Sequence, residues 1–203
     1  MPTISEILSA ELGQKQEYIE NVITLMDEGN TIPFIARYRK EMHGAMDDTV
    51  LRTLETRLAY LRNLQQRRDE VKNSIENQGK LTEELSAAID NAATLAEVED
   101  LYRPYKQKRR TRGSIAREKG LEPLAAAIFA QEGQDPGKLA ESYLDPEKGV
   151  STVEEALQGA NDIIAENLSD DADIRKALRL KMERQALVTV QAVDPEFTVV
   201  VVH

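Results

Sequence analysis

Apolar residues recur along most of this chain at spacings of three and four, which is the period of an amphipathic helix. Three short segments of this kind open the chain and cover about residues 4–12, 15–27 and a stretch after residue 31. Thr3 and Glu6 have the spacing of a capping box, and Pro33 suits a first helical turn. Helices separated by such short breaks predict a helix-turn-helix-like part over residues 1–45, although ordinary bundles show the same pattern.

The next segment predicts one long helix. It begins at Asp47 and Asp48, ends near Asn77, and carries an apolar stripe formed by Leu51, Leu54, Leu58, Leu61, Val71 and Ile75. The stripe weakens over residues 65–70, so we expect that part to face solvent. A helix of about 30 residues is about 45 Å long, more than the width of a small domain. We therefore expect it to project, or to brace several packing units.

Further short helices follow in a helical subdomain that we assign to residues 79–184. Their expected starts are marked by capping residues or prolines at Thr82, Thr94, Ser114, Pro123, Asp135, Ser151, and Asp171 or Asp173. The tail then changes character. Residues 187–193 alternate apolar and polar side chains, and residues 197–202 are mostly β-branched, which predicts a β-hairpin. The expected fold is an all-α multi-helix bundle with one long helix (46–78) and this short hairpin in the tail, residues 185–203.

Charge is unevenly distributed in this chain. Residues 103–119 hold eight cations and one acid, a local charge of +7, whereas the whole chain carries −10. The cations are Arg103, Lys106, Lys108, Arg109, Arg110, Arg112, Arg117 and Lys119. Because Pro104 should end the preceding helix, we expect this strip to be a loop. Crowded like charges repel one another, so an anionic partner would stabilise the strip.

The sequence shows this cationic strip but leaves its partner open. Its arginines and lysines could neutralise the phosphates of a nucleic acid, with Tyr102 and Tyr105 offering ring faces for stacking. They could instead dock on an acidic protein surface, or simply be solvated. The tyrosines could equally pack inward and fix the strip.

A second cationic cluster lies after Pro33 and consists of Arg37, Arg39 and Lys40. Residues 37 and 40 share a helix face at this spacing, so in a helix-turn-helix these cations would meet backbone phosphate. The alternative is that the many acids of the chain pair with them.

Composition argues against catalysis. The chain has no cysteine and two histidines, and its glycines form no phosphate-cradling motif. We expect His43, beside Gly44, to be an exposed residue at a helix end. Asp170, Asp171 and Asp173 fit the N-terminus of a helix better than a metal site. We therefore expect no enzyme, cofactor or metal. The sequence has neither a signal peptide nor a membrane span, which favours the cytoplasm.

Several stretches resemble one protein family. They are E-G-N-T-I-P-F-I-A-R-Y-R-K-E at 28–41, D-D-T-V-L-R-T-L-E-T-R-L at 47–58, E-D-L-Y-R-P-Y-K-Q-K-R-R-T-R at 99–112, A-R-E-K-G-L-E-P-L-A at 116–125 and E-K-G-V at 147–150. Over about residues 1–184 the chain is similar to the N-terminal region of Tex, the bacterial transcription accessory family. From about Gln185 the resemblance ends, and Arg103 stands where the family is expected to have an apolar residue.

The resemblance implies a helical region with a helix-turn-helix-like part, in proteins linked to transcription and nucleic-acid binding. In the family it is followed by a ribonuclease-H-like domain that lacks the full catalytic set, by helix-hairpin-helix motifs and by an OB-fold RNA-binding module. The sequence ends at His203, before those domains. We therefore expect weaker nucleic-acid binding here than in a whole family member.

Together these observations predict a non-catalytic helical domain that contacts the backbone phosphates of RNA or DNA. The expected contact residues are Arg103, Lys106, Lys108, Arg109, Arg110, Arg112, Arg37, Arg39 and Lys40. The alternative is a scaffold that docks the strip on other domains of the full-length protein or on the transcription machinery.

Overall fold

The computed structural model describes residues 2–106 and 110–189 of the chain. Within these residues there are eleven α-helices, two 3-10 turns and no strand, so the predicted all-α fold is confirmed. One isolated β-bridge joins Asp145 and Val150. The chain divides into two compact units, Met1–Lys106 and Gln107–His203, and the described part of each unit has its own buried core.

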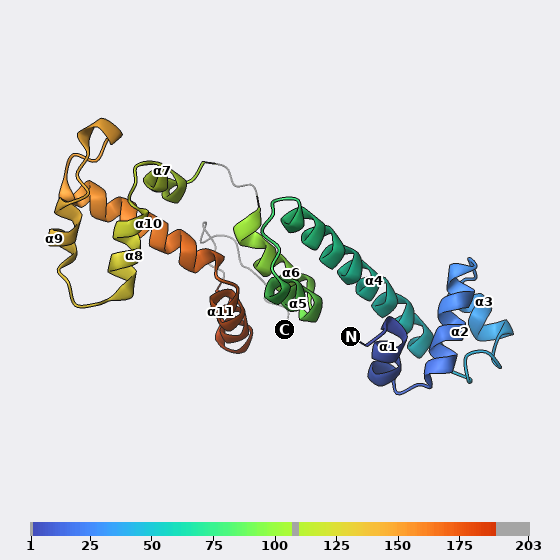
Figure 1. Cartoon of the computed structure of the whole chain (residues 1–203). Helices are drawn as coiled ribbons and strands as arrows, with labels where there is room; N and C mark the ends of the chain where they lie inside the picture. Colours follow the sequence, from blue (N-terminus) through green and yellow to red (C-terminus); the bar gives the residue numbers. More distant parts are fainter. Residues whose placement is uncertain (1, 107–109, 190–203) are drawn as a thin grey trace, which may run out of the picture. The chain divides into compact units, whose positions relative to one another are not determined.

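Unit 1 is built around the predicted long helix. Its elements are α1 (Ile4–Leu12), α2 (Gln16–Asp27), α3 (Ile32–Tyr38), α4 (Asp48–Glu76), α5 (Glu83–Asn91), α6 (Leu95–Tyr102) and the 3-10 turn η1 (Arg103–Tyr105). Figure 1 shows α4 running from the cluster of α1, α2 and α3 at one end to α5 and α6 at the other.

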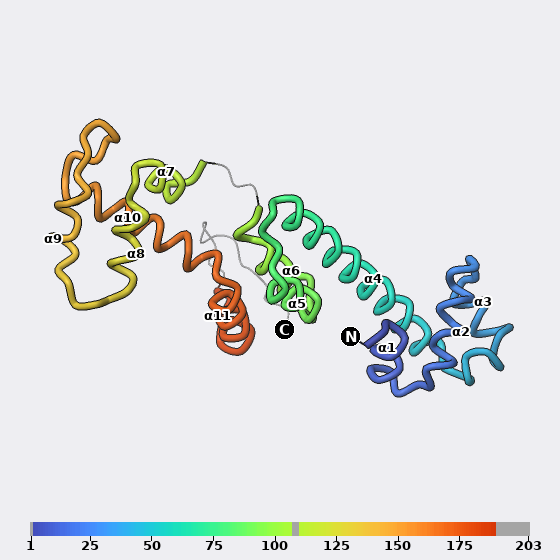
Figure 2. The backbone as a smooth tube through the Cα atoms, in the orientation of Figure 1, coloured from blue at the N-terminus to red at the C-terminus, as the bar shows by residue number. Residues whose placement is uncertain are grey.

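Helix α4 braces two cores within unit 1. Its first half buries Leu51, Leu54 and Leu58 against α1, α2 and α3, and its second half buries Val71 and Ile75 against α5 and α6. This is the bracing role that its length suggested. The tube in Figure 2 shows that α4 is continuous between the two ends. Burying a full leucine or isoleucine side chain contributes about 1.5–3 kcal/mol, so this stripe contributes much of the stability of unit 1.

Unit 2 packs around one central helix. Its elements are α7 (Arg112–Glu118), α8 (Glu122–Ala130), α9 (Pro136–Glu141), the 3-10 turn η2 (Pro146–Lys148), α10 (Val153–Asp170) and α11 (Ala172–Gln185). Helices α7, α8 and α9 all pack against α10, whose buried face is formed by Ala156, Ala160 and Ile163. These small and medium side chains let the surrounding helices approach closely.

The helix caps account for most of the boundaries that the sequence predicted. Thr3 N donates to Glu6 Oε2 at 2.7 Å and Glu6 N donates to Thr3 Oγ1 at 3.2 Å, which confirms the first capping box. The box expected at Ser151 lies one residue later, because Thr152 caps α10 and its partner is Glu155.

The strip 103–119 is not a single loop, contrary to our expectation. Residues 103–105 form η1, and residues 112–118 form α7, which is capped by Thr111 rather than by Ser114. The boundary between the units also differs from the expected subdomain 79–184, because residues 79–106 belong to unit 1. Thr111 takes the cap because its hydroxyl accepts from Ser114 N at 3.0 Å while Ser114 Oγ accepts from Thr111 N at 2.9 Å.

His43 is buried, with 1% of its surface exposed, so the prediction of an exposed helix-end residue is wrong. The turn that carries it folds back onto α2. Asn21 Nδ2 donates to Met42 O at 3.1 Å, and Gly44 lies so close to the Tyr18 ring that a β-carbon there would be 2.4 Å from it. Gly44 has φ +60°, which glycine adopts without strain. These contacts carry His43 into the core.

The end of the described chain is helical and then extended. Helix α11 begins after Asp171, whose carboxylate accepts from Ile174 N at 2.8 Å, as predicted for one of the two candidate aspartates. Leu187 and Val188 are exposed and belong to no strand. The rest of the predicted hairpin, residues 190–203, lies outside the described residues.

Candidate nucleic-acid interface

The strip 103–119 crosses the boundary between the two units. Arg103 and Lys106 belong to the end of unit 1, whereas Arg110 and Arg112 belong to unit 2. Lys108 and Arg109 lie outside the described residues. The strip is therefore continuous in sequence, but its cations are held by two separately packed units.

Two exposed cations of the strip, Lys106 and Arg110, form ion pairs with acids of their own unit. Lys106 Nζ pairs with Glu99, which also accepts from Arg67 Nε at 2.6 Å. Burial raises the pKa of Glu99, but the hydrogen bonds from Arg67 and Lys106 outweigh burial and hold that pKa below its ordinary value. In unit 2, Arg110 Nη2 lies 3.0 Å from Glu118 Oε2. Both cations are thus partly neutralised by this chain.

The last two cations of the strip hold α7 in position. Arg117 Nη1 lies 3.2 Å from Glu166 Oε2, and its Nη2 donates to Asn167 Oδ1 at 2.7 Å. Lys119 Nζ donates to the carbonyl oxygen of Gly149 at 2.7 Å. These contacts join α7 to α10 and to the turn after η2, so both side chains have a structural role.

The remaining described cations of the strip differ in their availability. Arg103 is exposed but has a partner in the chain. Arg112 is exposed and forms no ion pair or hydrogen bond with any residue that the structure describes. The side chains of Arg110 and Glu118 are 70% and 60% exposed, and such a pair contributes only about 0–1 kcal/mol, so a phosphate can compete with Glu118. Arg110 and Arg112 are therefore the strip's most available described cations.

The two tyrosines that flank Pro104 pack inward, which favours the alternative in which they fix the strip. Tyr102 shares a hydrogen bond of 2.9 Å with Ser74 Oγ, and both Tyr102 and Tyr105 pack against the core formed by α4, α5 and α6. Arg67 and Lys106 lie over the Tyr102 ring, 5.5 and 5.4 Å from its centroid. Its hydrogen bond and its packing against this core thus hold Tyr102 within unit 1.

The second cluster, Arg37, Arg39 and Lys40, is arranged differently. Helix α3 ends at Tyr38, so Arg37 lies in its last turn, and Arg39 and Lys40 follow it. All three side chains are exposed. Within residues 2–106 and 110–189 none of them pairs with a carboxylate, so the acid pairing considered for them is not found. An otherwise acidic chain here presents three available cations side by side in sequence.

Two aromatic rings lie among these cations. Phe34 and Tyr38 are 37% and 56% exposed, and their ring centroids lie 5.2 Å apart at an interplanar angle of 47°. Arg39 Cζ lies 5.5 Å from the Phe34 centroid and Arg37 Cζ lies 5.9 Å from the Tyr38 centroid. Such cation–π contacts are weak at exposed sites, about 0.5–1 kcal/mol, and they keep the guanidinium groups close to the rings. We call Phe34, Arg37, Tyr38, Arg39 and Lys40 the α3 surface.

The two rings of the α3 surface are not among the site residues predicted from the sequence. The signal was nevertheless present, because residues 34 and 38 are four apart and therefore adjacent on a helix. Helix α3 buries Ile32 and Ile35 instead. Because those two isoleucines occupy the core-facing positions of α3, the Phe34 and Tyr38 rings lie at the surface.

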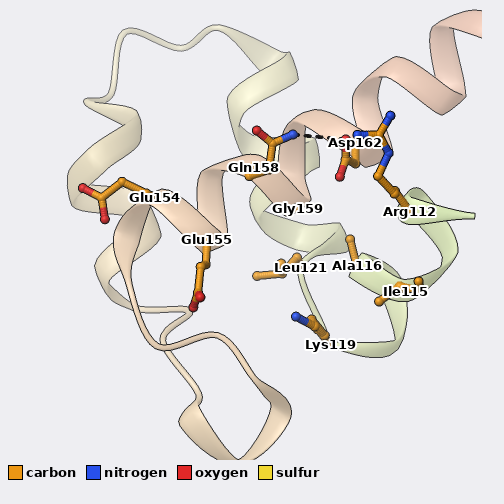
Figure 3. A pocket seen from close by; sticks show the side chains of 10 residues that line it. All are labelled: Arg112, Ile115, Ala116, Lys119, Leu121, Glu154, Glu155, Gln158, Gly159 and Asp162. Carbon is orange, nitrogen blue, oxygen red and sulfur yellow. Dashed lines mark hydrogen bonds between the residues drawn. The ribbon is translucent and has the colours of Figure 1, made fainter.

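A hollow of about 470 Å³ lies between α7 and α10 in unit 2. Figure 3 shows Arg112 and Lys119 on the side of α7, and Glu154, Glu155 and Asp162 along α10. Gln158 Nε2 donates to Asp162 Oδ1 at 3.2 Å. Because carboxylates line the wall opposite the cations, this hollow is less suited to a phosphate than the α3 surface.

Two family models match this chain. The Tex-like protein N-terminal domain matches residues 2–76, and the Tex central region matches residues 131–197. The second match includes part of the tail, residues 185–203, that we expected to diverge from the family. None of the helices in the described ranges combines the length and apolar character that crossing a membrane requires.

Individual relatives support the same assignment. The protein tex of Bordetella pertussis is 49% identical over 172 residues, which are 85% of this chain and 22% of that protein. Transcriptional accessory protein Tex of Neisseria gonorrhoeae is 45% identical over 195 residues, 96% of this chain and 26% of that protein. Human S1 RNA-binding domain-containing protein 1 is 33% identical over 177 residues, 86% of this chain and 17% of that protein.

The described residues form packed helices with exposed cations at the end of α3 and in the strip. The two matches to family models and the relatives show the family. The chain belongs to the Tex family and carries its N-terminal and central-region domains. It spans about a quarter of the length of its bacterial Tex relatives.

Proposed function

We propose that this chain is a non-catalytic, nucleic-acid-associated part of a Tex-like transcription accessory protein, and that its exposed cations contact backbone phosphates. One observation carries the proposal. Arg37, Arg39 and Lys40 are exposed, lie together at the end of α3 and pair with no carboxylate in the described residues. In a chain of net charge −10, three such cations favour an anionic partner.

The strip is the second contact region in this proposal. Arg110 and Arg112 supply its available cations in unit 2, and Arg103 and Lys106 supply exposed cations in unit 1. Lys108 and Arg109, which the structure does not describe, complete the expected set. Contacts of this kind carry little sequence information, because they read phosphate rather than base edges. We therefore expect binding with weak sequence preference.

The order of helices in unit 1 suggests which elements present the cations. We propose that α2, the following turn and α3 act as a helix-turn-helix-like part that presents the α3 surface to the nucleic acid.

The names of the relatives favour a role in transcription, and RNA as one partner. A cysteine-free chain suits a reducing compartment, so we propose that it acts in the cytoplasm.

Fluorescence anisotropy with labelled oligonucleotides tests the proposal. The chain of 203 residues is titrated into labelled 20-nucleotide RNA, single-stranded DNA and duplex DNA at 20–200 mM salt. We expect affinity to fall steeply with salt, with a log–log slope near −0.7 per phosphate contacted on single strands and −0.9 on duplex DNA. If no oligonucleotide binds at 20 mM salt, the proposal is wrong for this chain.

Matched variants locate the contacts. Replacing Arg37, Arg39 and Lys40 by glutamine should reduce the slope on single strands by up to about two units. The control replaces Lys80, Lys138 and Lys181, three exposed lysines scattered over the chain, and changes the net charge by the same amount. If both triple variants lose the same affinity, binding depends on net charge and not on the α3 surface.

A protein-docking role is the second candidate function. The observation that favours it is the pairing of Lys106 and Arg110 with acids of this chain, since the same cations could exchange those acids for carboxylates of another domain. The part of a Tex relative that this chain does not span is added in trans, and association is measured by titration calorimetry. Arg109→Glu with Arg110→Glu should abolish association, and unchanged association would remove this candidate.

A further inference from the structure

We propose that the α3 surface binds single-stranded nucleic acid by stacking bases on Tyr38 and Phe34. This inference rests on the proposed function and adds to it the class of ligand. Phosphate contacts alone do not distinguish single-stranded from duplex nucleic acid, whereas stacking of bases on aromatic rings does. The proposal therefore concerns the two rings rather than the three cations around them.

The Phe34 and Tyr38 rings are available for stacking because other side chains of α3 anchor this helix to the core. Helix α3 attaches to unit 1 through Ile32 and Ile35, which are 3% and 0% exposed, and Ala36 packs against the same core. Tyr38 is 56% exposed. Phe34 is 37% exposed and its ring lies 5.2 Å from that of Tyr38, so the two form adjoining exposed apolar surface, which marks an interaction site more often than a single exposed side chain does.

The surroundings of the rings fit a single-stranded nucleic acid better than an apolar partner. Residues 31–40 contain three cations and no acid. The guanidinium groups of Arg37 and Arg39 already lie 5.9 and 5.5 Å from the Tyr38 and Phe34 centroids, so phosphate contacts and ring faces occur within one side-chain length. Single-strand binding sites combine a cationic track with aromatic faces in this way.

A duplex would gain much less from this surface. Its bases are stacked on one another and present only their edges in the grooves, so an external ring finds no free base face. In a single strand the bases can splay out and stack on tyrosine or phenylalanine. Stacking is tolerant of sequence because every base has two faces, which agrees with the weak sequence preference proposed above.

Anisotropy with a matched abasic strand isolates the stacking contribution. The chain is titrated with a 12-nucleotide oligothymidine and with a 12-unit abasic sugar-phosphate strand that carries the same charge. We expect the base-containing strand to bind about tenfold more tightly, a typical effect of one stacked base. Equal affinity for the two strands would overturn the inference while leaving phosphate binding intact. Failure to bind either strand would overturn the proposed function as well.

Variants of the rings assign the effect to α3. Tyr38→Leu with Phe34→Leu should remove the tenfold preference for the base-containing strand and leave the salt slope unchanged. Tyr38→Phe should retain the preference, because it keeps the ring. Since Phe34 is the less exposed of the two, Tyr38→Leu alone provides a variant that is expected to fold, which circular dichroism checks. A preference that survives in the Tyr38→Leu and double variants would show that bases stack elsewhere.

Discussion

Gly159 of α10 lies directly against Leu121: a β-carbon at position 159 would be 2.4 Å from Leu121 Cδ1 and 3.3 Å from Ala116 Cβ. Leu121 and Ala116 are 1% and 3% exposed, so neither side chain can swing into solvent. The close packing of α10 on α7 and on the turn before α8 therefore depends on the absence of a side chain at 159.

Gly159→Ala should destabilise unit 2 by about 1–3 kcal/mol through overpacking. Helix propensity alone predicts the opposite sign, because alanine is favoured over glycine by about 1 kcal/mol in a helix interior. Urea denaturation followed by circular dichroism measures the difference. Asn161→Ala, an exposed change on the same helix, is the control and should stay within about 0.5 kcal/mol of the parent. A stabilised Gly159→Ala variant would contradict the packing described above.

The ion pair between Glu11 and Arg57 should make unit 1 sensitive to acid. Arg57 Nε and Nη2 each donate at 2.7 Å to one oxygen of Glu11, joining α4 to α1. The hydrogen bonds from Arg57 hold the pKa of Glu11 below its ordinary value near 4.5. A lowered folded-state pKa stabilises the protein above the unfolded-state value, and this stabilisation is lost as pH falls through the folded-state value.

We therefore expect Glu11→Gln to destabilise the protein at pH 7 and to have progressively less effect as pH falls below about 4.5. Urea denaturation at pH 7, 5, 4 and 3 measures this convergence. Glu17→Gln is the control, since the exposed Glu17 side chain forms no ion pair within residues 2–106 and 110–189. Parallel pH profiles for the parent and Glu11→Gln would show that the ion pair contributes no stability.

His43 is buried without a hydrogen bond from either ring nitrogen to any residue that the structure describes. A buried polar group left unsatisfied costs about 1–3 kcal/mol. His43→Leu, which is apolar and of similar volume, should therefore raise the free energy of unfolding by about 1 kcal/mol. His43→Ala should lower it, because it leaves a cavity. Loss of stability in the leucine variant would show that the imidazole is hydrogen-bonded in solution.

The outer face of α11 should tolerate polar substitution. Ile174, Leu178 and Met182 lie four residues apart and are 37%, 55% and 62% exposed, and the described structure buries no residue of this helix. Leu178→Gln with Met182→Gln should change stability by less than about 0.5 kcal/mol and should weaken retention on a hydrophobic-interaction column. For comparison, Ile163→Ala in the α10 core should cost about 2–5 kcal/mol. A large loss from the α11 variant would show that its face is covered.

Local sequence signals were sufficient where a helix boundary depends on its nearest neighbours. The capping box of Thr3 and Glu6 and the stripe of α4 are examples, because cap and stripe involve residues three or four apart. The start of α10 was less certain. Both Ser151 and Thr152 precede a glutamate by three residues, and the choice of Thr152 goes with burial of Ala156 and Ala160 against α7 and α8.

The candidate interface could not be predicted from local sequence signals alone. Charge density indicated the strip, but the strip crosses the boundary between two units, and one of its cations, Arg117, pairs with Glu166, 49 residues further along the chain. Conversely, pairing with nearby acids was the alternative for the cluster after Pro33, and its cations are left without such partners in the described structure. A residue's distance in sequence from an opposite charge does not give its distance in space.

By itself, the sequence determined that this protein is helical, where most helices begin, how α4 is striped, and that its cations gather in two places. The tertiary structure alone decided that His43 is buried, that Tyr102 packs inward and that Phe34 and Tyr38 face solvent. The physical reason is how far apart in sequence the interacting residues are. Helix formation and capping are settled by residues within about one turn of each other, whereas burial and ion pairing depend on which helix surfaces meet, and that is a property of the whole packed unit.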